Sequence, residues 1–187
     1  MEVELSAEAK DKRLNRMVAI SVVIFSVFTG VCGIKDGNLV QAMQQAQSNS
    51  VDRWNEYQST KLKLHLAEGT RREIAILATG EAQPRAAIAL TELDSDMKKY
   101  REEASTLATA AKGYSDSYDA LNVHDDQFDA SEALISTAIS LAAVAALAES
   151  RKLLVASWAF GAFGMFMGVC GFAGWAFHPD VLSTFLG

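Results

Sequence analysis

The sequence predicts an all-α membrane protein with three transmembrane helices and a long extramembrane helical hairpin that resembles a coiled coil. Three observations support this fold class. Residues 153–177 carry no charged side chain over about 25 residues, which is enough to cross a hydrocarbon layer of roughly 30 Å. Residues 17–34 form a second uncharged run near the other end. Most charged residues lie between these runs, where apolar residues recur at the spacing of packed helices.

The polar and basic flank 1–16 precedes the first predicted transmembrane helix, 17–34. As a helix, this run of about 18 uncharged residues would extend roughly 27 Å, close to the thickness of the hydrocarbon layer. A cleaved signal peptide is the competing interpretation, because a basic segment followed by an apolar stretch is its signature. The apolar run is longer than a usual signal core and no Ala-x-Ala site follows it, so we expect an uncleaved anchor.

Residues 35–130 are predicted to form the extramembrane helical domain. We expect one helix over about 38–78 and another over about 85–111, with a break at Pro84 and its neighbours. Gly113 and the serines after it predict a second break, followed by a third helix that leads to the membrane. The outer ends of the hairpin should continue into the membrane helices. The clearest 3-4 spacing in the chain is that of Leu90, Leu93, Met97, Tyr100, Ala104, Leu107 and Ala111.

Residues 131–148 are predicted to be the second transmembrane helix, although their length is at the lower limit for a span. The alternative is a buried helix of the soluble part, which would leave two spans. Beyond Glu132 no face of this segment carries charge, and the polar turn 149–152 follows at once. This pattern favours a membrane hairpin formed with 153–177, after which comes the tail 178–187.

Basic residues near the spans predict the orientation. Four of them precede the first span, and Arg151 and Lys152 lie between the second and third. With three spans both groups fall on one side, which we expect to be cytoplasmic. The helical domain 35–130 would then be extracytoplasmic. With two spans Arg151 and Lys152 would lie outside, against the positive-inside rule.

Composition and isolated residues argue against several function classes. The net charge of −6 is opposite to that of a typical nucleic-acid-binding protein. Cys32 and Cys170 both fall in predicted spans, where we expect small apolar residues rather than a disulfide. The histidines His65, His124 and His178 lack the spacing of metal ligands. We therefore expect no catalytic, cofactor or metal site, and no enzymatic activity.

One local cluster is a candidate interaction site. Trp54, Tyr57, Gln58 and Lys61 are spaced so that all four lie on one face of a helix. The functional interpretation is a recognition surface with aromatic anchors. The structural interpretation, which we favour from the sequence, is that Trp54 and Tyr57 fill the core of the helical domain while Lys61 extends outward.

The segment WNEYQSTKLK, together with the downstream FDASEALISTAISLAAVAALAESRKLLVASWAFGAFG, resembles domain-of-unknown-function family 4337, a group of small bacterial membrane proteins. In that family an N-terminal anchor leads into a W-x-x-Y-Q segment with a lysine close behind, and an apolar pair with a short basic turn closes the chain. The family has no assigned activity. The resemblance implies a bacterial inner-membrane protein, and the basic flanks imply a cytoplasmic N-terminus with an extracytoplasmic helical domain.

A stripe of small residues marks the third span. Gly161, Gly164, Gly168 and Gly171 recur every three or four residues, which lets helix backbones approach closely in lipid. A matching stripe on 131–148 consists of Ala138, Ala142 and Ala146. Packing of these two segments against each other and oligomerisation between chains are both open interpretations.

These features favour a non-enzymatic protein that mediates assembly, as a homo-oligomer or as an accessory subunit of a larger membrane complex. Its expected partners are membrane lipid and either other copies of the chain or a membrane protein complex. The alternative is a pore or transporter subunit lined by hydroxyls such as those of Ser136, Thr137 and Ser140. Transporters usually carry ionisable residues within their spans, and the interiors of these segments contain none.

Overall fold

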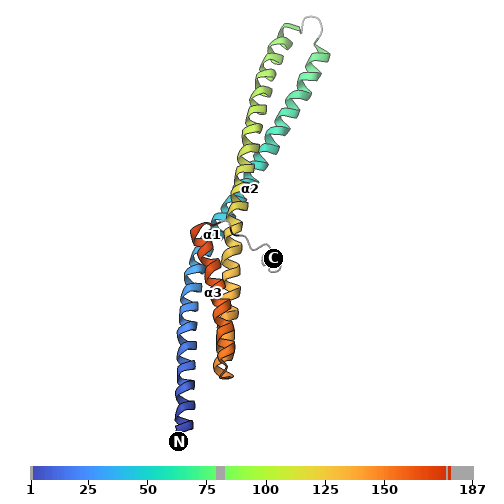
Figure 1. Cartoon of the computed structure of the whole chain (residues 1–187). Coiled ribbons are helices and arrows are strands. Elements are labelled where there is room, and N and C mark those ends of the chain that lie inside the picture. The colour runs from blue at the N-terminus through green and yellow to red at the C-terminus, as the bar shows by residue number, and fades with distance from the viewer. Residues whose placement is uncertain (1, 79–82, 176, 178–187) are drawn as a thin grey trace. The chain divides into compact units, whose positions relative to one another are not determined.

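The computed structural model describes residues 2–78, 83–175 and 177, with side chains from Lys12 onward. These residues form three helices, α1 (Glu2–Leu77), α2 (Gln83–Leu147) and α3 (Arg151–Ala173) (Figure 1). Each helix contains a segment that is long and apolar enough to cross a membrane by length and composition. The predicted all-helical fold is confirmed. The predicted tail 178–187 lies outside the described residues.

The chain divides into two compact units. The three-helix unit comprises Met1–Ala42 and Ala120–Gly187, and the hairpin unit comprises Met43–Asp119. Helices α1 and α2 contribute to both units, while α3 belongs to the three-helix unit alone.

Helix α2 passes without interruption through Gly113 and residues 115–117, so the predicted second break is wrong. The space around the Gly113 Cα is open, and the Ser117 hydroxyl donates a 2.8 Å hydrogen bond to the Gly113 carbonyl. A glycine inside a helix costs about 1 kcal/mol relative to alanine, which a long helix with a packed face can absorb. The hairpin helices do continue into the apolar segments, as predicted.

The ends of the helices agree with most of the sequence signals. Helix α1 ends at Leu77 and α2 begins at Gln83, as the break before Pro84 predicts, while residues 79–82 lie outside the described part. Between α2 and α3 the chain turns through Glu149, whose φ is 49°, and the Ser150 amide donates to the Ala145 carbonyl at 3.0 Å. Arg151 belongs to α3 itself rather than to this turn.

Helix α3 is shorter than the predicted span 153–177 at its C-terminal end. It stops at Ala173 because Gly174 adopts the left-handed conformation, with φ 66°, and its amide donates to the Cys170 carbonyl. Its 23 residues still extend about 34 Å, enough for a hydrocarbon layer.

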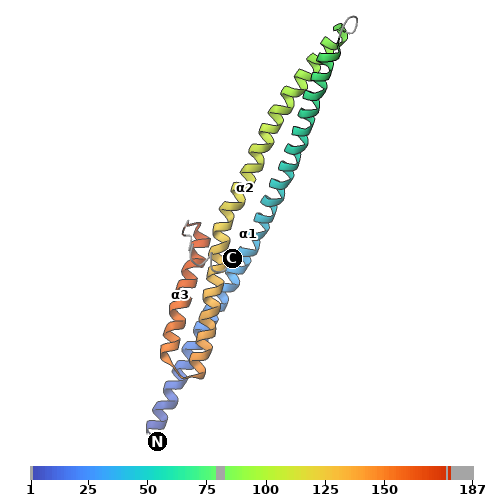
Figure 2. The ribbon, with the colours of Figure 1, turned by 90° about the vertical axis from the view of Figure 1, so that its right-hand side faces the viewer.

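The core of the hairpin unit lies between antiparallel parts of α1 and α2, which run side by side in both views (Figures 1 and 2). Met97 of α2 is buried against Leu64 and Ala67 of α1, with Leu93 and Tyr100 packed beside them. The predicted seam is therefore the buried face of α2 in this unit. The facing stripe of α1 also has 3-4 spacing, interrupted by one ten-residue step between Ser50 and Thr60, and consists of Met43, Ala46, Ser50, Thr60, Leu64 and Ala67.

The three-helix unit has its core where the first part of α1, the last part of α2 and all of α3 meet. One cluster joins Leu14 and Val18 of α1 to Ala142 and Ala145 of α2 and to Leu154 of α3. A second cluster contains Phe25 of α1 with Ile135 and Ala138 of α2. The alanines Ala138, Ala142 and Ala145 of α2 thus face larger side chains of α1 and α3, which allows the helices to approach closely.

Candidate functional site

The glycine stripe of α3 packs inside the three-helix unit. A Cβ at Gly164 would lie 2.7 Å from Ile135 Cγ1 and 3.1 Å from the Ser131 carbonyl oxygen of α2. A Cβ at Gly161 would overlap the Phe25 ring of α1. At Gly168 and Gly171 it would lie 2.7 and 2.8 Å from the rings of Phe28 and Phe128, respectively. All four glycines therefore make room for neighbouring helices of the same chain.

The matching stripe on α2 is covered as well. Ala138 and Ala142 are fully buried, and Ala146 packs partly buried beside the first cluster. The Ser157 hydroxyl of α3 donates a 2.7 Å hydrogen bond to the Ala138 carbonyl, which joins the two stripes directly. These contacts favour packing of the two stripes within one chain over oligomerisation between chains. A second chain could use the same stripes only after the three helices had separated.

The outer face of the three-helix unit is made of large apolar side chains. Twelve such residues on α1 and α3 expose between 42% and 72% of their surface. Exposed apolar surface of this extent is unusual for a water-soluble monomer, whose largest patches cover a few hundred Å². These residues are Ile20, Val23, Ile24, Val27, Val31, Ile34, Val155, Phe160, Phe163, Phe166, Val169 and Phe172.

The Trp158 indole and several hydroxyl groups in the apolar segments are hydrogen-bonded within the unit. Trp158 Nε1 of α3 donates to the Ser21 hydroxyl of α1 at 2.7 Å. The hydroxyls of Thr137 and Ser140 donate at 2.9 Å to carbonyls four residues earlier in α2. Two of the three residues considered for a pore lining thus have their donors engaged by their own helix.

The predicted Trp54 cluster lies on α1 in the hairpin unit, and the structure corrects our interpretation of it. Trp54 is 41% exposed and therefore does not fill the core, while Tyr57 and Lys61 are partly buried and Gln58 is exposed. The two aromatic rings meet edge to face with their centroids 5.4 Å apart. The side chain of Trp54 is thus held in place by Tyr57 while one side of it remains accessible.

A groove beside Trp54 runs along α2, and we call it the Trp54 groove. It has a volume of about 530 Å³ and includes Gly113, which offers no side chain and leaves the surface open. Its lining combines small and charged residues of α2 with the indole of Trp54, a residue type that is enriched at protein interfaces. The α2 residues that line it are Ala108, Thr109, Lys112, Gly113 and Asp116.

Two ion pairs connect the helices of the hairpin unit at its surface. Arg71 Nε lies 2.6 Å from Asp94 Oδ1, and Arg101 Nη2 lies 3.0 Å from Glu68 Oε1. The hydrogen bond from Arg101 lowers the pKa of Glu68, and the bond to Asp94 raises the pKa of Arg71. These pairs bridge the facing surfaces of α1 and α2 in this unit.

An acidic group lies in the three-helix unit, just outside the apolar segments. Burial, followed by the negative charges of Asp36 and Asp129, raises the pKa of Asp125 from 3.8 to about 6. Burial and Asp36 also raise the pKa of Asp129. The described residues contain no cluster of three His, Cys, Asp or Glu side chains that could hold a metal ion.

Next to this group, a buried glutamine anchors the chain after α3. Gln127 Nε2 of α2 donates to the carbonyls of Trp175 and Phe177 at 2.8 and 2.5 Å, and its Oε1 lies 3.0 Å from His124 Nδ1. Neither this contact nor the facing stripe of α1 was predicted from the sequence. The stripe could have been found from its 3-4 spacing, despite the polar Ser50 and Thr60. The contact of Gln127 joins residues too far apart in the chain for any local pattern to reveal it.

The fold and these surfaces define an all-helical protein with a hairpin unit and a three-helix unit whose outer face is apolar. Residues 14–174 match the family described as Domain of unknown function (DUF4337), and the chain belongs to this family. The match includes the Trp54 cluster and the glycine stripe. No curated protein and no solved structure matches the chain.

Proposed function

We propose that this protein is a non-enzymatic integral protein of the bacterial inner membrane, whose hairpin unit mediates assembly. One observation carries the membrane part of the proposal. In the three-helix unit glycine, alanine and serine lie at the close contacts between helices, while large apolar residues such as Ile24 and Phe163 are exposed on the outer face. Water as a solvent would disfavour so extensive an exposed apolar face, whereas lipid accepts it and favours close helix packing.

The orientation proposed is that of three spans with a cytoplasmic N-terminus. Basic residues before the first span and at the start of α3 favour one cytoplasmic side for both. The hairpin unit is then extracytoplasmic. A tag at the N-terminus should be protected in intact cells, while a cysteine introduced at exposed Leu66 should react with an impermeant thiol reagent. The reverse pattern of reactivity would contradict this orientation.

The assembly role is supported by the Trp54 groove. Aromatic side chains that are rigidly held yet accessible are enriched among the residues that contribute most to protein binding. Trp54 is such a side chain, since Tyr57 holds its ring and the groove leaves one side open. A homo-oligomer and an accessory subunit of a membrane complex would both use this surface. In the first case the partner is a second copy, and in the second it is another membrane protein.

The experiment compares the full chain with Trp54→Ala and with Leu66→Ala. Leu66 is a matched control, because it is also a large exposed apolar residue of the hairpin unit, 63% exposed. Each protein is purified in mild detergent, and its mass is measured by light scattering after size-exclusion chromatography. Co-purifying proteins are then identified.

We expect an oligomer or a defined complex for the wild type and for Leu66→Ala, and its loss in Trp54→Ala. A wild-type monomer that co-purifies with nothing would contradict the assembly role. Release of the intact chain by alkaline carbonate would contradict the membrane location, whatever the state of assembly.

A further inference from the structure

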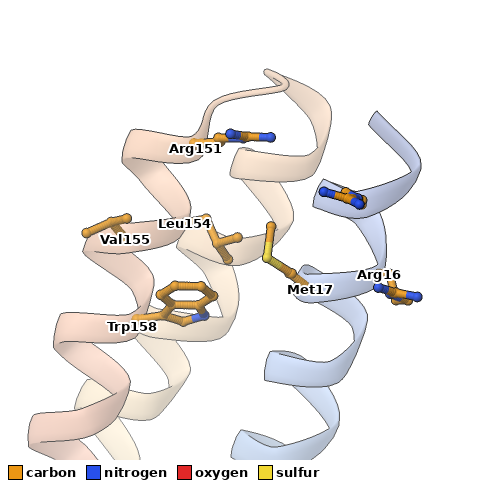
Figure 3. A pocket seen from close by; sticks show the side chains of 7 residues that line it. Arg16, Met17, Arg151, Leu154, Val155 and Trp158 are labelled. Carbon is orange, nitrogen blue, oxygen red and sulfur yellow. The ribbon is translucent and has the colours of Figure 1, made fainter. Parts of the chain in front are cut away.

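A cavity at one end of the three-helix unit combines three arginines with an apolar floor (Figure 3). It has a volume of about 440 Å³ and lies between the first part of α1 and the start of α3. Arg13 and Arg16 of α1 and Arg151 of α3 contribute the cationic groups. Figure 3 shows Arg151 extending from the start of α3 toward α1.

The positive charge of this cavity is not neutralised within the described part of the chain. None of the three arginines forms an ion pair with a carboxylate whose side chain the structure describes, and all three are exposed. The N-cap residue of α3, Ser150, makes no side-chain hydrogen bond to the first turn of the helix. The positive end of the α3 dipole therefore adds to the charge near Arg151.

The floor of the cavity is apolar, and contacts with neighbouring residues hold its side chains in place. Leu154 is buried in the core cluster that also includes Leu14 and Val18, and Met17 packs against the same cluster. The hydrogen bond from Trp158 Nε1 to the Ser21 hydroxyl fixes the indole between α3 and α1. Trp158 nevertheless remains 41% exposed, so part of its ring is available to a ligand.

We propose that this cavity binds an anionic glycerophospholipid, with the phosphate at the arginines and an acyl chain along Met17, Leu154 and Trp158. This inference rests on the membrane location proposed above. Guanidinium groups bind phosphate oxygens through paired, charge-assisted hydrogen bonds. The arginines flank the uncharged runs of α1 and α3, which places them at the depth of lipid headgroups. A ligand with an anionic head and an apolar tail matches both parts of the cavity.

The test uses the full-length protein, delipidated in mild detergent and titrated with lipids of identical acyl chains in native mass spectrometry. Phosphatidylglycerol is the anionic probe and phosphatidylcholine the zwitterionic one. A basic residue near an anionic membrane surface contributes about fivefold in affinity. We therefore expect the wild type to bind phosphatidylglycerol at least about tenfold more tightly than phosphatidylcholine. Equal binding of the two lipids would overturn the proposal without any variant.

Two variants with the same change in net charge locate the effect. The triple variant R13Q/R16Q/R151Q should lose the preference for phosphatidylglycerol. The control R72Q/K98Q/K99Q removes three exposed basic residues of the hairpin unit and should keep it. A loss of preference in both variants would assign the effect to overall charge and overturn the proposal. Circular dichroism of both variants checks that the helices are intact.

Inorganic phosphate distinguishes a lipid site from a site for a soluble anion. Excess phosphate should leave binding of phosphatidylglycerol almost unchanged, because it cannot use the apolar floor. Displacement of the lipid by phosphate alone would overturn the proposal.

Alkaline carbonate treatment separates a failure of the proposed membrane location from a failure of the lipid site. Release of the wild type from membranes refutes the membrane location and the lipid site together, while a retained protein without lipid preference refutes the lipid site only.

Discussion

The two units of this protein share the two long helices α1 and α2, yet they expose opposite kinds of residues. In the hairpin unit Leu64 and Met97 lie between the helices, and charged side chains form ion pairs on the outside. In the three-helix unit the close contacts involve Gly164 and Ala138, and large apolar side chains such as Ile24 face outward. The membrane location proposed above accounts for this difference, because it places the outer face of the three-helix unit in lipid and that of the hairpin unit in water.

Burial of large apolar residues stabilises the hairpin unit because water is excluded from them. In lipid this gain is small, since the hydrocarbon is as apolar as the side chains. Under the proposed membrane location, the three-helix unit would instead be stabilised by dispersion contacts and hydrogen bonds between closely approaching helices, such as that from Ser157 to the Ala138 carbonyl. Four predictions test this contrast between the two units.

The largest effect should come from a charge on the outer face of the three-helix unit. Ile24→Lys places an ammonium group at a 51% exposed site within the first predicted span. If lipid is the solvent there, the substitution costs about 3 kcal/mol, and the amount of chain in the membrane fraction should fall. Leu66→Lys, at a 63% exposed site of the hairpin unit, should change stability by less than about 0.5 kcal/mol.

Membrane fractionation and chemical unfolding in detergent measure the two variants side by side. If Ile24→Lys were tolerated as well as Leu66→Lys, the outer face of the three-helix unit would be exposed to water. The comparison between the units would then lose its physical basis.

Glycine substitutions should have opposite signs in the two units. Gly164→Ala introduces a Cβ 2.7 Å from Ile135 Cγ1 and 3.1 Å from a backbone oxygen, so the helices must shift, at a cost of about 1–3 kcal/mol. Gly113→Ala meets nothing within 4 Å and should stabilise the hairpin unit by about 1 kcal/mol. Thermal unfolding in detergent, followed by circular dichroism, gives both values. Stabilisation by Gly164→Ala would show that the tight packing of α3 is not required.

Much of the fold follows from the sequence because its signals are local. The 3-4 spacing of Met97 and its neighbours predicts the buried face of α2, and the uncharged runs predict the three apolar segments. The predicted helix break at Gly113 is wrong because a single glycine weakens a helix only locally. Helix α2 has 65 residues, and its tertiary packing outweighs this local cost. The end of α3 before Gly174 was not predicted, because the sequence stays apolar as far as Phe177. Hydropathy alone does not indicate that Gly174 ends the helix in a left-handed conformation.

The candidate surfaces were less predictable. Spacing places Trp54 and Tyr57 on one helix face but does not reveal which side of the facing helix lies opposite. Trp54 is exposed because the α2 surface beside it contains Gly113 and Ala108, which are too small to cover it. The cavity between α1 and α3 joins Arg16 to Arg151 across most of the chain, and only the tertiary structure brings them together.

A smaller and pH-dependent effect is expected at Asp125 in the three-helix unit. Burial and the charges of Asp36 and Asp129 raise its pKa from 3.8 to about 6, so the folded state binds this proton more tightly than the unfolded state. Stability should therefore fall as the pH rises from about 4 to about 6. Asp125→Asn should be more stable than the wild type at pH 8 and less dependent on pH, in contrast to the exposed control Asp119→Asn. A wild type that gains stability over this interval would contradict the assignment.

The smallest effect should be found at the ion pairs of the hairpin unit, and its pH dependence should have the opposite sign. Arg101 lowers the pKa of Glu68 below 4.5, so the pair stabilises the fold above that pH, and the contribution is lost as the pH falls through the lowered value. The Arg101 side chain is 59% exposed and that of Glu68 is 26% exposed, so solvent screens the pair, and Arg101→Gln should accelerate hydrogen exchange only slightly, and only at low salt. Exchange resolved by segment reports on each unit separately, because local openings differ in free energy along a chain. A large effect of Arg101→Gln that persists at high salt would mean that packing around Glu68, and not charge, holds this part of the hairpin together.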